Sequence, residues 1–182
     1  MLSALKLIVT TIWLLLPAYT PNNFAVLFGG GKPLDFGKTF FDGKRILGDG
    51  KTIRGFISGI AGGVAIANVQ YVIEKALNFK IFSTLLYIDF ITLSLLLSFG
   101  AMSGDAFGSF LKRRIGYKRG DFLPVIDQLM FLFLALAFAS SSPSFFKLFD
   151  LTRILIAILI TPLLHLTTNY IAYKLKLKKV PW

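Results

Sequence analysis

Residues 81–127 read "IFSTLLYIDFITLSLLLSFGAMSGDAFGSFLKRRIGYKRGDFLPVID", and the character of this stretch changes at position 104. From 81 to 103 it is apolar apart from several hydroxyl groups and the carboxylate of Asp89. An apolar run of about 20 residues is long enough to span a bilayer as a helix. From 104 to 121 the stretch is crowded with charges, and after Pro124 it becomes apolar again. It therefore predicts two membrane helices joined by a polar connection.

The rest of the chain repeats this alternation of apolar runs and polar connections. Of its 182 residues 55% are hydrophobic and 19 are Phe, which is far more than a soluble domain of this size carries. The predicted spans cover about 7–28, 55–74, 81–103, 122–140 and 154–173, and the long polar connections cover 29–54 and 104–121. The predicted fold is an all-α integral membrane protein with five transmembrane helices, in which residues 1–182 form a single domain.

Two of these spans carry features that predict how they pack. The first is interrupted by Pro17 and Pro21, with Asn22 and Asn23 between its two halves. The second carries small residues along its length, and small residues let another helix approach closely. These are the glycines at positions 55, 59, 62 and 63. We therefore expect a neighbouring helix to pack tightly against the second span.

The basic residues predict the orientation of the chain in the membrane. Most of the 20 Lys and Arg residues lie in the two long polar connections and in the tail after residue 173. An odd number of spans places these segments on one side, and cytoplasmic segments carry the excess of Lys and Arg. The other side receives Lys6, Lys75, Lys80, Lys147 and Arg153. The prediction is a multi-pass protein of the cell membrane, N-terminus out and C-terminus in, with both polar connections and the active site on the cytoplasmic face.

The polar end of the opening stretch carries the residues that we expect to perform chemistry. If the third helix continues beyond the membrane, Asp105, Ser109 and Lys112 share one of its faces, with Arg113 beside them. A turn would then bring Asp127, one turn inside the fourth span, back towards Asp105. Carboxylates in apolar segments are costly and indicate function. Two carboxylates beside cations are typical of a Mg²⁺ site that takes its remaining ligands from substrate phosphates.

The polar connection 29–54 is a second candidate for phosphate binding. Its segment "LGDGKT" is similar to the end of a P-loop, but Arg45 stands where that motif requires Gly. The glycines can still let backbone N–H groups approach a phosphate. The residues expected to bind nucleotide or phosphate are Lys38, Lys44, Arg45, Lys51, Thr52 and Arg54 in this connection, and Ser109, Lys118 and Asp121 in the other.

The segment "GDAFGSFLKR", residues 104–113, resembles the signature of the phosphatidate cytidylyltransferase family. The positions that match in identity and spacing are Gly104, Asp105, Ser109, Lys112 and Arg113, followed by Lys118, Pro124 and Asp127, with Asp121 displaced. Gln128 and Met130 depart from the Arg and the last Asp of that signature. With five spans and the glycine-rich segment after the first, nearly the whole chain is similar to the archaeal CDP-archaeol synthase family.

This resemblance implies a nucleotidyltransferase of archaeal ether-lipid biosynthesis. Such an enzyme converts 2,3-bis-O-geranylgeranyl-sn-glycerol 1-phosphate and CTP to CDP-archaeol and pyrophosphate, with Mg²⁺ as cofactor. On the matching positions the resemblance implies that Asp105 and Asp127 hold the metal and that Lys112, Arg113 and Lys118 bind phosphates. The implied partners are CTP, the isoprenoid lipid and the membrane. The net charge of +11 does not call for nucleic acid, because cationic loops also orient a membrane protein and attract phosphate.

The residues alone leave other interpretations open. Salt bridges within the connection, from Asp105 to Lys112 for example, would also explain its charges. A small transporter or channel would explain Asp89, Asn68 and the broken first span, and a cytidylyltransferase acting on an ester phosphatidate would use the same site. The lone His, His165, is expected to pack between helices with a hydrogen bond to a neighbour. The oligomeric state and the number of metal ions stay open, and the absence of Cys excludes thiolate sites.

Overall fold

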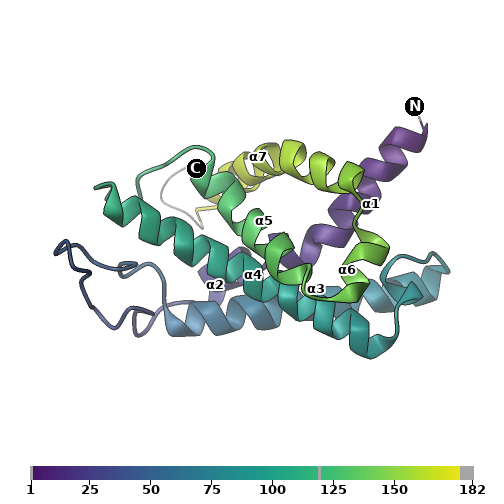
Figure 1. Ribbon diagram of the computed structural model, residues 1–182, viewed down its shortest axis with the longest axis horizontal. Coiled ribbons are helices and arrows are strands. Elements are labelled where there is room, and N and C mark those ends of the chain that lie inside the picture. The colour runs from purple at the N-terminus through teal and green to yellow at the C-terminus, as the bar shows by residue number, and fades with distance from the viewer. Residues whose placement is uncertain (1, 119, 177–182) are drawn as a thin grey trace.

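The computed structural model describes residues 2–118 and 120–176, and within these ranges the regular secondary structure is helical. The described connections consist of turns and irregular backbone, with two isolated β-bridges, Pro33–Thr52 and Thr39–Arg45. The helices are α1 (Leu2–Tyr19), α2 (Pro21–Phe28), α3 (Ile53–Leu77), the 3-10 helix η1 (Phe82–Thr84), α4 (Tyr87–Arg114), α5 (Ile126–Ala139), α6 (Pro143–Leu148) and α7 (Leu151–Lys174). They pack around α4, which contacts α1, α2, α3 and α5 (Figure 1).

Four helical segments of the described chain are long and apolar enough to cross a membrane: Ser3–Phe28, Ile53–Leu77, Tyr87–Arg114 and Leu151–Lys174. The predicted span 122–140 corresponds to α5, which is apolar but has only 14 residues. Large apolar side chains cover the outer faces of the bundle, and Ile57, Val69 and Leu159 are 54–75% exposed. The all-α membrane architecture is confirmed, whereas five complete crossings remain a prediction.

The break between α1 and α2 has a chemical cause. Pro21 has no N–H group, so it cannot donate to the carbonyl of Pro17 four residues earlier. The hydroxyl of Ser98 in α4 donates to that carbonyl instead, at 2.8 Å. Helix α2 then starts with Pro21 in its first turn. Asn22 and Asn23 consequently lie inside α2. The prediction that they lie between the two halves of the first span is wrong.

Glycines of α3 allow the close approach that the sequence predicts for the second span. A Cβ atom on Gly63 would lie 2.7 Å from the carbonyl oxygen of Pro17, and one on Gly59 would lie 3.0 Å from that of Pro21. The first distance is shorter than real Cβ contacts, and the second is tighter than most of them. The prediction is confirmed, and the neighbours are the end of α1 and the start of α2.

Helices α4 and α5 are also in backbone contact at glycines. A Cβ atom on Gly104 would lie 2.5 Å from the carbonyl oxygen of Met130, and one on Gly100 would lie 2.6 Å from that of Leu134. The two helices run antiparallel, so this contact fixes the start of α5 against the last turns of α4. It places Asp127 at the same end of the bundle as Asp105.

The boundaries predicted for the third span, 81–103, differ from those of α4. The helix starts only at Tyr87 and continues to Arg114, because the preceding residues form a turn around Glu74. This carboxylate is 1% exposed. It accepts hydrogen bonds at 2.8–3.1 Å from the Trp13 indole and from the backbone N–H groups of Ile81, Phe82 and Ser83. Apolar composition does not distinguish such a capped turn from the start of a helix.

The molecule therefore has two chemically different ends (Figure 1). One end carries the α2–α3 connection, the last turns of α4 and the α4–α5 connection. These segments are rich in charged residues. The opposite end carries the start of α1, the turn between α3 and α4, and α6. The residues expected to form the site all belong to the first of these ends.

Candidate active site

The connection between α2 and α3 folds around the buried carboxylate of Asp35. This side chain accepts backbone N–H bonds from Gly37, Leu47 and Gly48 at 2.9–3.0 Å, and the Arg45 guanidinium donates to it at 2.8 Å. Burial alone would raise the pKa of the Asp35 carboxyl, but these donors outweigh it and hold the pKa well below its usual value. Arg45, predicted to bind phosphate, is thus engaged in ordering the connection.

Arg114 docks this connection on the end of α4. Its guanidinium lies 4.8 Å from the ring centroid of Phe40 and 5.0 Å from that of Phe110. It also forms an ion pair with Asp42. The ammonium of Lys44 donates to the backbone carbonyl of Arg114 at 2.9 Å. Lys44, another predicted phosphate-binding residue, therefore helps to hold the connection on α4.

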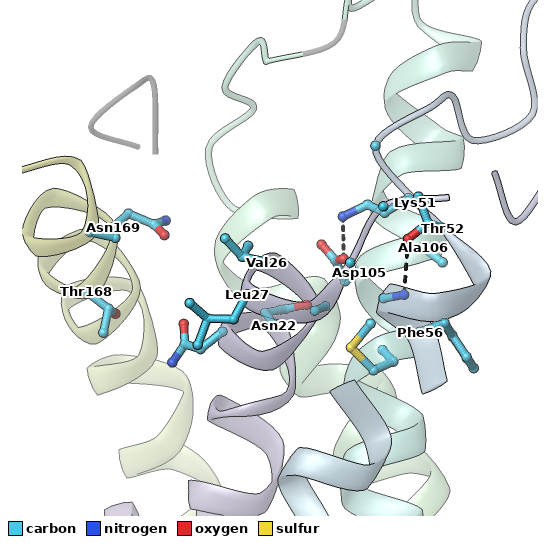
Figure 2. A pocket seen from close by; sticks show the side chains of 18 of the residues that line it. Asn22, Val26, Leu27, Lys51, Thr52, Phe56, Asp105, Ala106, Thr168 and Asn169 are labelled. Atoms are coloured by element: carbon cyan, nitrogen blue, oxygen red, sulfur yellow. Dashed lines mark hydrogen bonds and ion pairs between the residues drawn. The ribbon is translucent and has the colours of Figure 1, made fainter. Parts of the chain in front are cut away.

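Lys51 forms an ion pair with Asp105 where the connection enters α3. Both side chains are about a quarter exposed, at 27% and 28%. The next residue, Thr52, caps α3, and its hydroxyl accepts the N–H of Gly55 at 3.1 Å. Figure 2 shows both contacts as dashed lines. The N-terminus of a helix attracts anions through its N–H groups and its dipole. A cation, a carboxylate and a helix N-terminus thus meet at one point.

A cavity of about 630 Å³ opens beside this ion pair, between α2, α3, α4 and α7. One wall is formed by the Gly-rich end of the connection and by α4, with Asp49, Gly50, Lys51 and Asp105. The facing wall comes from the membrane helices α2 and α7, and Figure 2 shows Val26, Leu27, Thr168 and Asn169 on that side. The cavity therefore joins a charged surface to a largely apolar one.

Lys112 and Asp127 form a second ion pair at this end, at 2.8 Å. Asp127 also accepts the N–H of Leu123 at 2.9 Å, and Lys112 donates to the backbone carbonyl of Asp121 at 3.1 Å. The predicted metal ligands Asp105 and Asp127 are thus at one end of the bundle, but each is paired with a different lysine. Both carboxylates therefore form salt bridges, although not the Asp105–Lys112 pair considered from the sequence.

Arg113 and Arg54 connect the pieces of this end. The Nε of Arg113 donates to the carbonyl of Leu47 at 3.4 Å, which links α4 to the α2–α3 connection. The Nε of Arg54 donates to the carbonyl of Gly29 at 2.8 Å and links the two ends of that connection. Arg113 and Arg54 therefore hold the connection in place, whereas Lys51 lines the cavity.

The remaining predicted residues have different surroundings. Ser109 is buried, at 7% exposure, although it lies on the same helix as Asp105 and Lys112. Lys38 and Lys118 are exposed. The carboxylate of Asp121 accepts the backbone N–H of Lys118 at 2.6 Å. None of these four is among the residues that line the cavity.

Comparison with known proteins bears on what this arrangement does. The CarS-like family model, described as CDP-archaeol synthase, matches residues 4–182. The chain belongs to the CDP-archaeol synthase family. This is an enzyme family, so the predicted class of membrane nucleotidyltransferase is confirmed over the transporter.

Individual CDP-archaeol synthases match the chain over almost its whole length. One from Archaeoglobus fulgidus is 63% identical over 178 residues, which cover 98% of this chain and 99% of the relative. One from Thermococcus gammatolerans is 42% identical over 181 residues and 100% of both chains. A solved structure of an intramembrane enzyme for archaeal membrane lipids biosynthesis has a TM-score of 0.70 at 34% identity, covering 86% of this chain and 90% of that one.

The sequence analysis of this CDP-archaeol synthase family member missed the wall formed by α2 and α7. Asn22, Asn23, Thr168 and Asn169 all line the cavity. His165 lines it too, and it lies 3.2 Å from the Asn169 amide, which agrees with the predicted hydrogen bond to a neighbour. The available signal was the polar run "HLTTNY" in an apolar span, whose polar side chains recur three and four residues apart on one helical face.

Proposed function

We propose that this protein transfers the cytidylyl group of CTP to 2,3-bis-O-geranylgeranyl-sn-glycerol 1-phosphate, giving CDP-archaeol and pyrophosphate. The observation that carries the proposal is the single cavity with the Lys51–Asp105 pair on one wall and two membrane helices on the other. A nucleotide and a lipid need a site of this mixed kind. Membership of the CDP-archaeol synthase family supports the choice of substrates.

The charged wall suits the triphosphate. Lys51 supplies an ammonium group, Gly50 leaves the backbone open to a close approach, and the capped N-terminus of α3 at Thr52 supplies a favourable dipole. A triphosphate entering here competes with Asp105 for Lys51. Binding of the nucleotide therefore releases the Asp105 carboxylate, which then faces the phosphates.

The lipid fits the opposite wall. The amides of Asn22 and Asn23 and the hydroxyl of Thr168 offer hydrogen bonds to a glycerol phosphate. Val26 and Leu27 of α2, also on this wall, are 56% and 59% exposed on the surface of the bundle. Isoprenoid chains attached to a headgroup in the cavity can therefore lie along apolar helix surfaces.

The reaction needs charge neutralisation more than proton transfer. An oxygen of the lipid phosphate forms a bond to the α-phosphorus of CTP, while the bond from that phosphorus to the bridging oxygen of the β-phosphate breaks. The electron pair leaves with pyrophosphate. Because the attacking phosphate is already anionic, no general base is required. The barrier is the approach of two anions, which Lys51, Lys112 and Arg113 lower by their positive charge.

The donor atoms at this end of the bundle fit Mg²⁺. In the described residues no three His, Cys, Asp or Glu side chains gather to hold a metal by themselves. Mg²⁺ commonly uses one or two carboxylates and completes its shell with water and substrate phosphates. We assign these carboxylates to Asp105 and Asp127, each of which would exchange its lysine for the ion. When bound, Mg²⁺ would neutralise charge on the phosphates and on the leaving pyrophosphate.

The active site would face the cytoplasm, with the N-terminus outside and the C-terminus inside. Because the chain contains no Cys, single Cys residues can report this directly. We expect Cys at Lys38 to react with an impermeant maleimide from the cytoplasmic side only, and Cys at Lys80 from the outer side only. Reaction of both from the same side would exclude the five-span orientation.

Turnover with defined acceptors tests the function itself. Purified protein would receive CTP labelled in its α-phosphate, Mg²⁺ and either the ether-linked isoprenoid glycerol phosphate or an ester-linked phosphatidate. We expect labelled nucleotide-lipid and one equivalent of pyrophosphate, with the ether lipid used at least as well as the ester. No product with either acceptor would exclude the proposal, whereas product from phosphatidate alone would replace the substrate.

A further inference from the structure

We propose that this protein has a second binding site, for the phosphate group of an anionic membrane lipid, at the end of the bundle opposite the Asp105 cavity. A cavity of about 500 Å³ lies there, lined by residues of α1, the turn between α3 and α4, α6 and the start of α7. None of its lining residues lines the Asp105 cavity. The inference is thus independent of the proposed function.

The charge of this second cavity is of one sign. Lys6, Lys80, Lys147 and Arg153 line it, each from a different element, and no Asp or Glu is among its lining residues. At this end of the molecule only Lys75 among the basic residues lies elsewhere, 5.5 Å from the ring centroid of Tyr71. Four cations gathered around one hollow repel one another, and an anion placed between them relieves this repulsion.

Three of these four positive charges have no negatively charged partner in the described residues. In the described part of the chain Lys6, Lys80 and Lys147 form no ion pair. Arg153 is paired with Asp150 at 2.9 Å, but its Nε is buried and has no hydrogen-bond acceptor among the described residues. An unsatisfied buried donor is unfavourable. The cavity thus offers both net charge and hydrogen-bond donors to an anionic group.

The apolar part of the cavity favours a lipid over a small soluble anion. Leu7, Leu14, Phe79, Ile81 and Leu148 also line it, and Leu14 is only 1% exposed. The remaining lining residues carry hydroxyl groups: Ser3, Thr10 and Thr84. A cavity lined by both cations and apolar side chains matches a molecule with a phosphate head and a hydrocarbon body. Basic pockets between membrane helices bind lipid headgroups in this way. Inorganic phosphate shares the head but gains nothing from the apolar side chains.

Ordinary interfacial lysines would explain the charges but not their arrangement. Lysines that merely extend to the membrane surface are expected around the whole perimeter of a bundle, since each acts alone. Here they converge from α1, α6 and the α3–α4 turn on the same hollow. A site of this kind predicts selectivity for anionic lipid that depends on particular lysines and not on total charge.

Trp13 provides a local probe of occupancy. It stacks edge-on against Phe79 with ring centroids 5.4 Å apart, and Phe79 lines the cavity. The chain has two Trp residues, so a Trp182→Phe background leaves Trp13 as the only one. Brominated lipid chains quench Trp fluorescence on contact. The experiment titrates brominated phosphatidylglycerol or brominated phosphatidylcholine into micelles of the full chain, without CTP or acceptor lipid.

We expect the anionic lipid to quench Trp13 at a concentration at least about tenfold lower than the zwitterionic lipid. The variant Lys80→Gln/Lys147→Gln should lose about this factor, since each juxtamembrane cation contributes a comparable free energy. The matched control Lys75→Gln/Lys174→Gln, with the same change in net charge, should keep it. Equal loss in both variants, or no preference in the parent protein, would overturn the proposal.

Inorganic phosphate distinguishes the two sources of the same chemical group. Failure of millimolar phosphate to reverse the quenching, together with the lysine dependence, supports a lipid site. If free phosphate reverses the quenching, with the same dependence on Lys80 and Lys147, the cavity binds phosphate groups in general. A soluble anion then competes with the lipid for this site. Both lysines are exposed, so we expect the variants to fold. Size-exclusion chromatography and retained cytidylyl transfer verify this.

Discussion

The two ends of the bundle each contain a buried carboxylate that gathers backbone N–H groups. Asp35, 6% exposed, accepts three backbone N–H bonds and two from the guanidinium of Arg45. Glu74, 1% exposed, accepts three backbone N–H bonds and one from Trp13. Each carboxylate accepts hydrogen bonds from backbone N–H groups of a connection that would otherwise lack acceptors. The two ends differ in what lies beside this buried carboxylate.

At the Asp35 end the ordered connection presents Lys51 and Asp105 to a cavity, and both are partly exposed. At the Glu74 end the four donors to the carboxylate are all neutral N–H groups. Burial of a carboxylate therefore does not distinguish the candidate site from the opposite end of the bundle. Asp105 differs from both buried carboxylates because its ion-pair partner is the flexible side chain of Lys51 and both residues line a cavity. We propose that a substrate or a metal ion displaces this cation.

The largest effect should follow from removing either of the two carboxylates assigned to Mg²⁺. We expect Asp105→Asn and Asp127→Asn each to lower turnover by about 10²- to 10³-fold, since each removes charge that would hold Mg²⁺. The thermal midpoint should change little, because Asn keeps the shape of Asp. Steady-state rates at saturating CTP across a Mg²⁺ titration measure this, and both variants should require more Mg²⁺.

Asp89→Asn is the matched control for these variants. Asp89 lies in the first turn of α4, at the end opposite Asp105. Turnover should stay within about tenfold, with any loss arising from stability, because a carboxylate in a first helical turn contributes only a modest dipole interaction. Loss of turnover in folded Asp89→Asn with retained turnover in Asp127→Asn would contradict the placement of the site.

A smaller effect should follow from removing the cation. We expect Lys51→Ala to lower kcat/KM for CTP by about tenfold or more while changing the apparent affinity for lipid much less, since one phosphate contact of this kind contributes about 1.5–3 kcal/mol. Lys38→Ala, in the same connection but outside the cavity, should have little effect. Kinetics with each substrate varied in turn measure the contrast. A loss confined to the lipid would reassign Lys51 to headgroup binding.

The opposite end should respond in stability alone. Glu74→Gln replaces one accepting oxygen by an NH₂ group, so some of the four N–H donors lose their partner. We expect a destabilisation of about 1–3 kcal/mol and nearly unchanged turnover of the folded protein. Thermal unfolding followed by circular dichroism, with activity measured well below the midpoint, tests both parts. A selective loss of turnover at full stability would make this end part of the chemistry.

The smallest effect should be the pH dependence contributed by Asp35. Its pKa is lowered in the folded protein, so its stabilising contribution is complete above the unfolded-state value of about 4 and is lost as pH falls below it. Asp35→Asn should therefore lower the thermal midpoint by a few degrees at pH 7 and by less at pH 3. A gap between the two proteins that stays constant with pH would show that the charge of Asp35 is not the stabilising feature.

Much of the architecture was predictable because long apolar runs in a sequence identify membrane helices. The apolar runs, the tight packing at Gly59 and Gly63 and the continuation of α4 to Arg114 all follow from local chemistry. The start of α4 at Tyr87 was not predictable, because the residues before it form a turn that is hydrogen-bonded to Glu74. Glu74 is itself held by Trp13, which is far from this turn in the sequence. The break at Pro21 was predictable, whereas its Ser98 partner was not.

Part of the candidate site was predictable, since Lys51, Thr52 and Asp105 were predicted from the sequence and line the cavity. The grouping of the charged residues was less so. Helical periodicity places Asp105 and Lys112 on one face, but the structure pairs them with Lys51 and Asp127. These partners come from other elements, so spacing along one helix cannot reveal them. The cavity wall that includes Thr168 was missed for the same reason, since it becomes a wall only when α7 faces α2.

The shortness of α5 has a mechanical consequence for the surrounding membrane. A helix of 14 residues rises about 21 Å, whereas the hydrocarbon of a bilayer is about 30 Å thick. A bilayer adapts to such a mismatch by thinning locally, at a cost that grows with each ångström. If α5 crosses the bilayer as the sequence predicts, we expect the lipid beside it to be compressed and its headgroups to lie deeper than elsewhere around the protein. The membrane surface would then be lowered next to Asp127, and turnover would depend on bilayer thickness as well as on lipid chemistry.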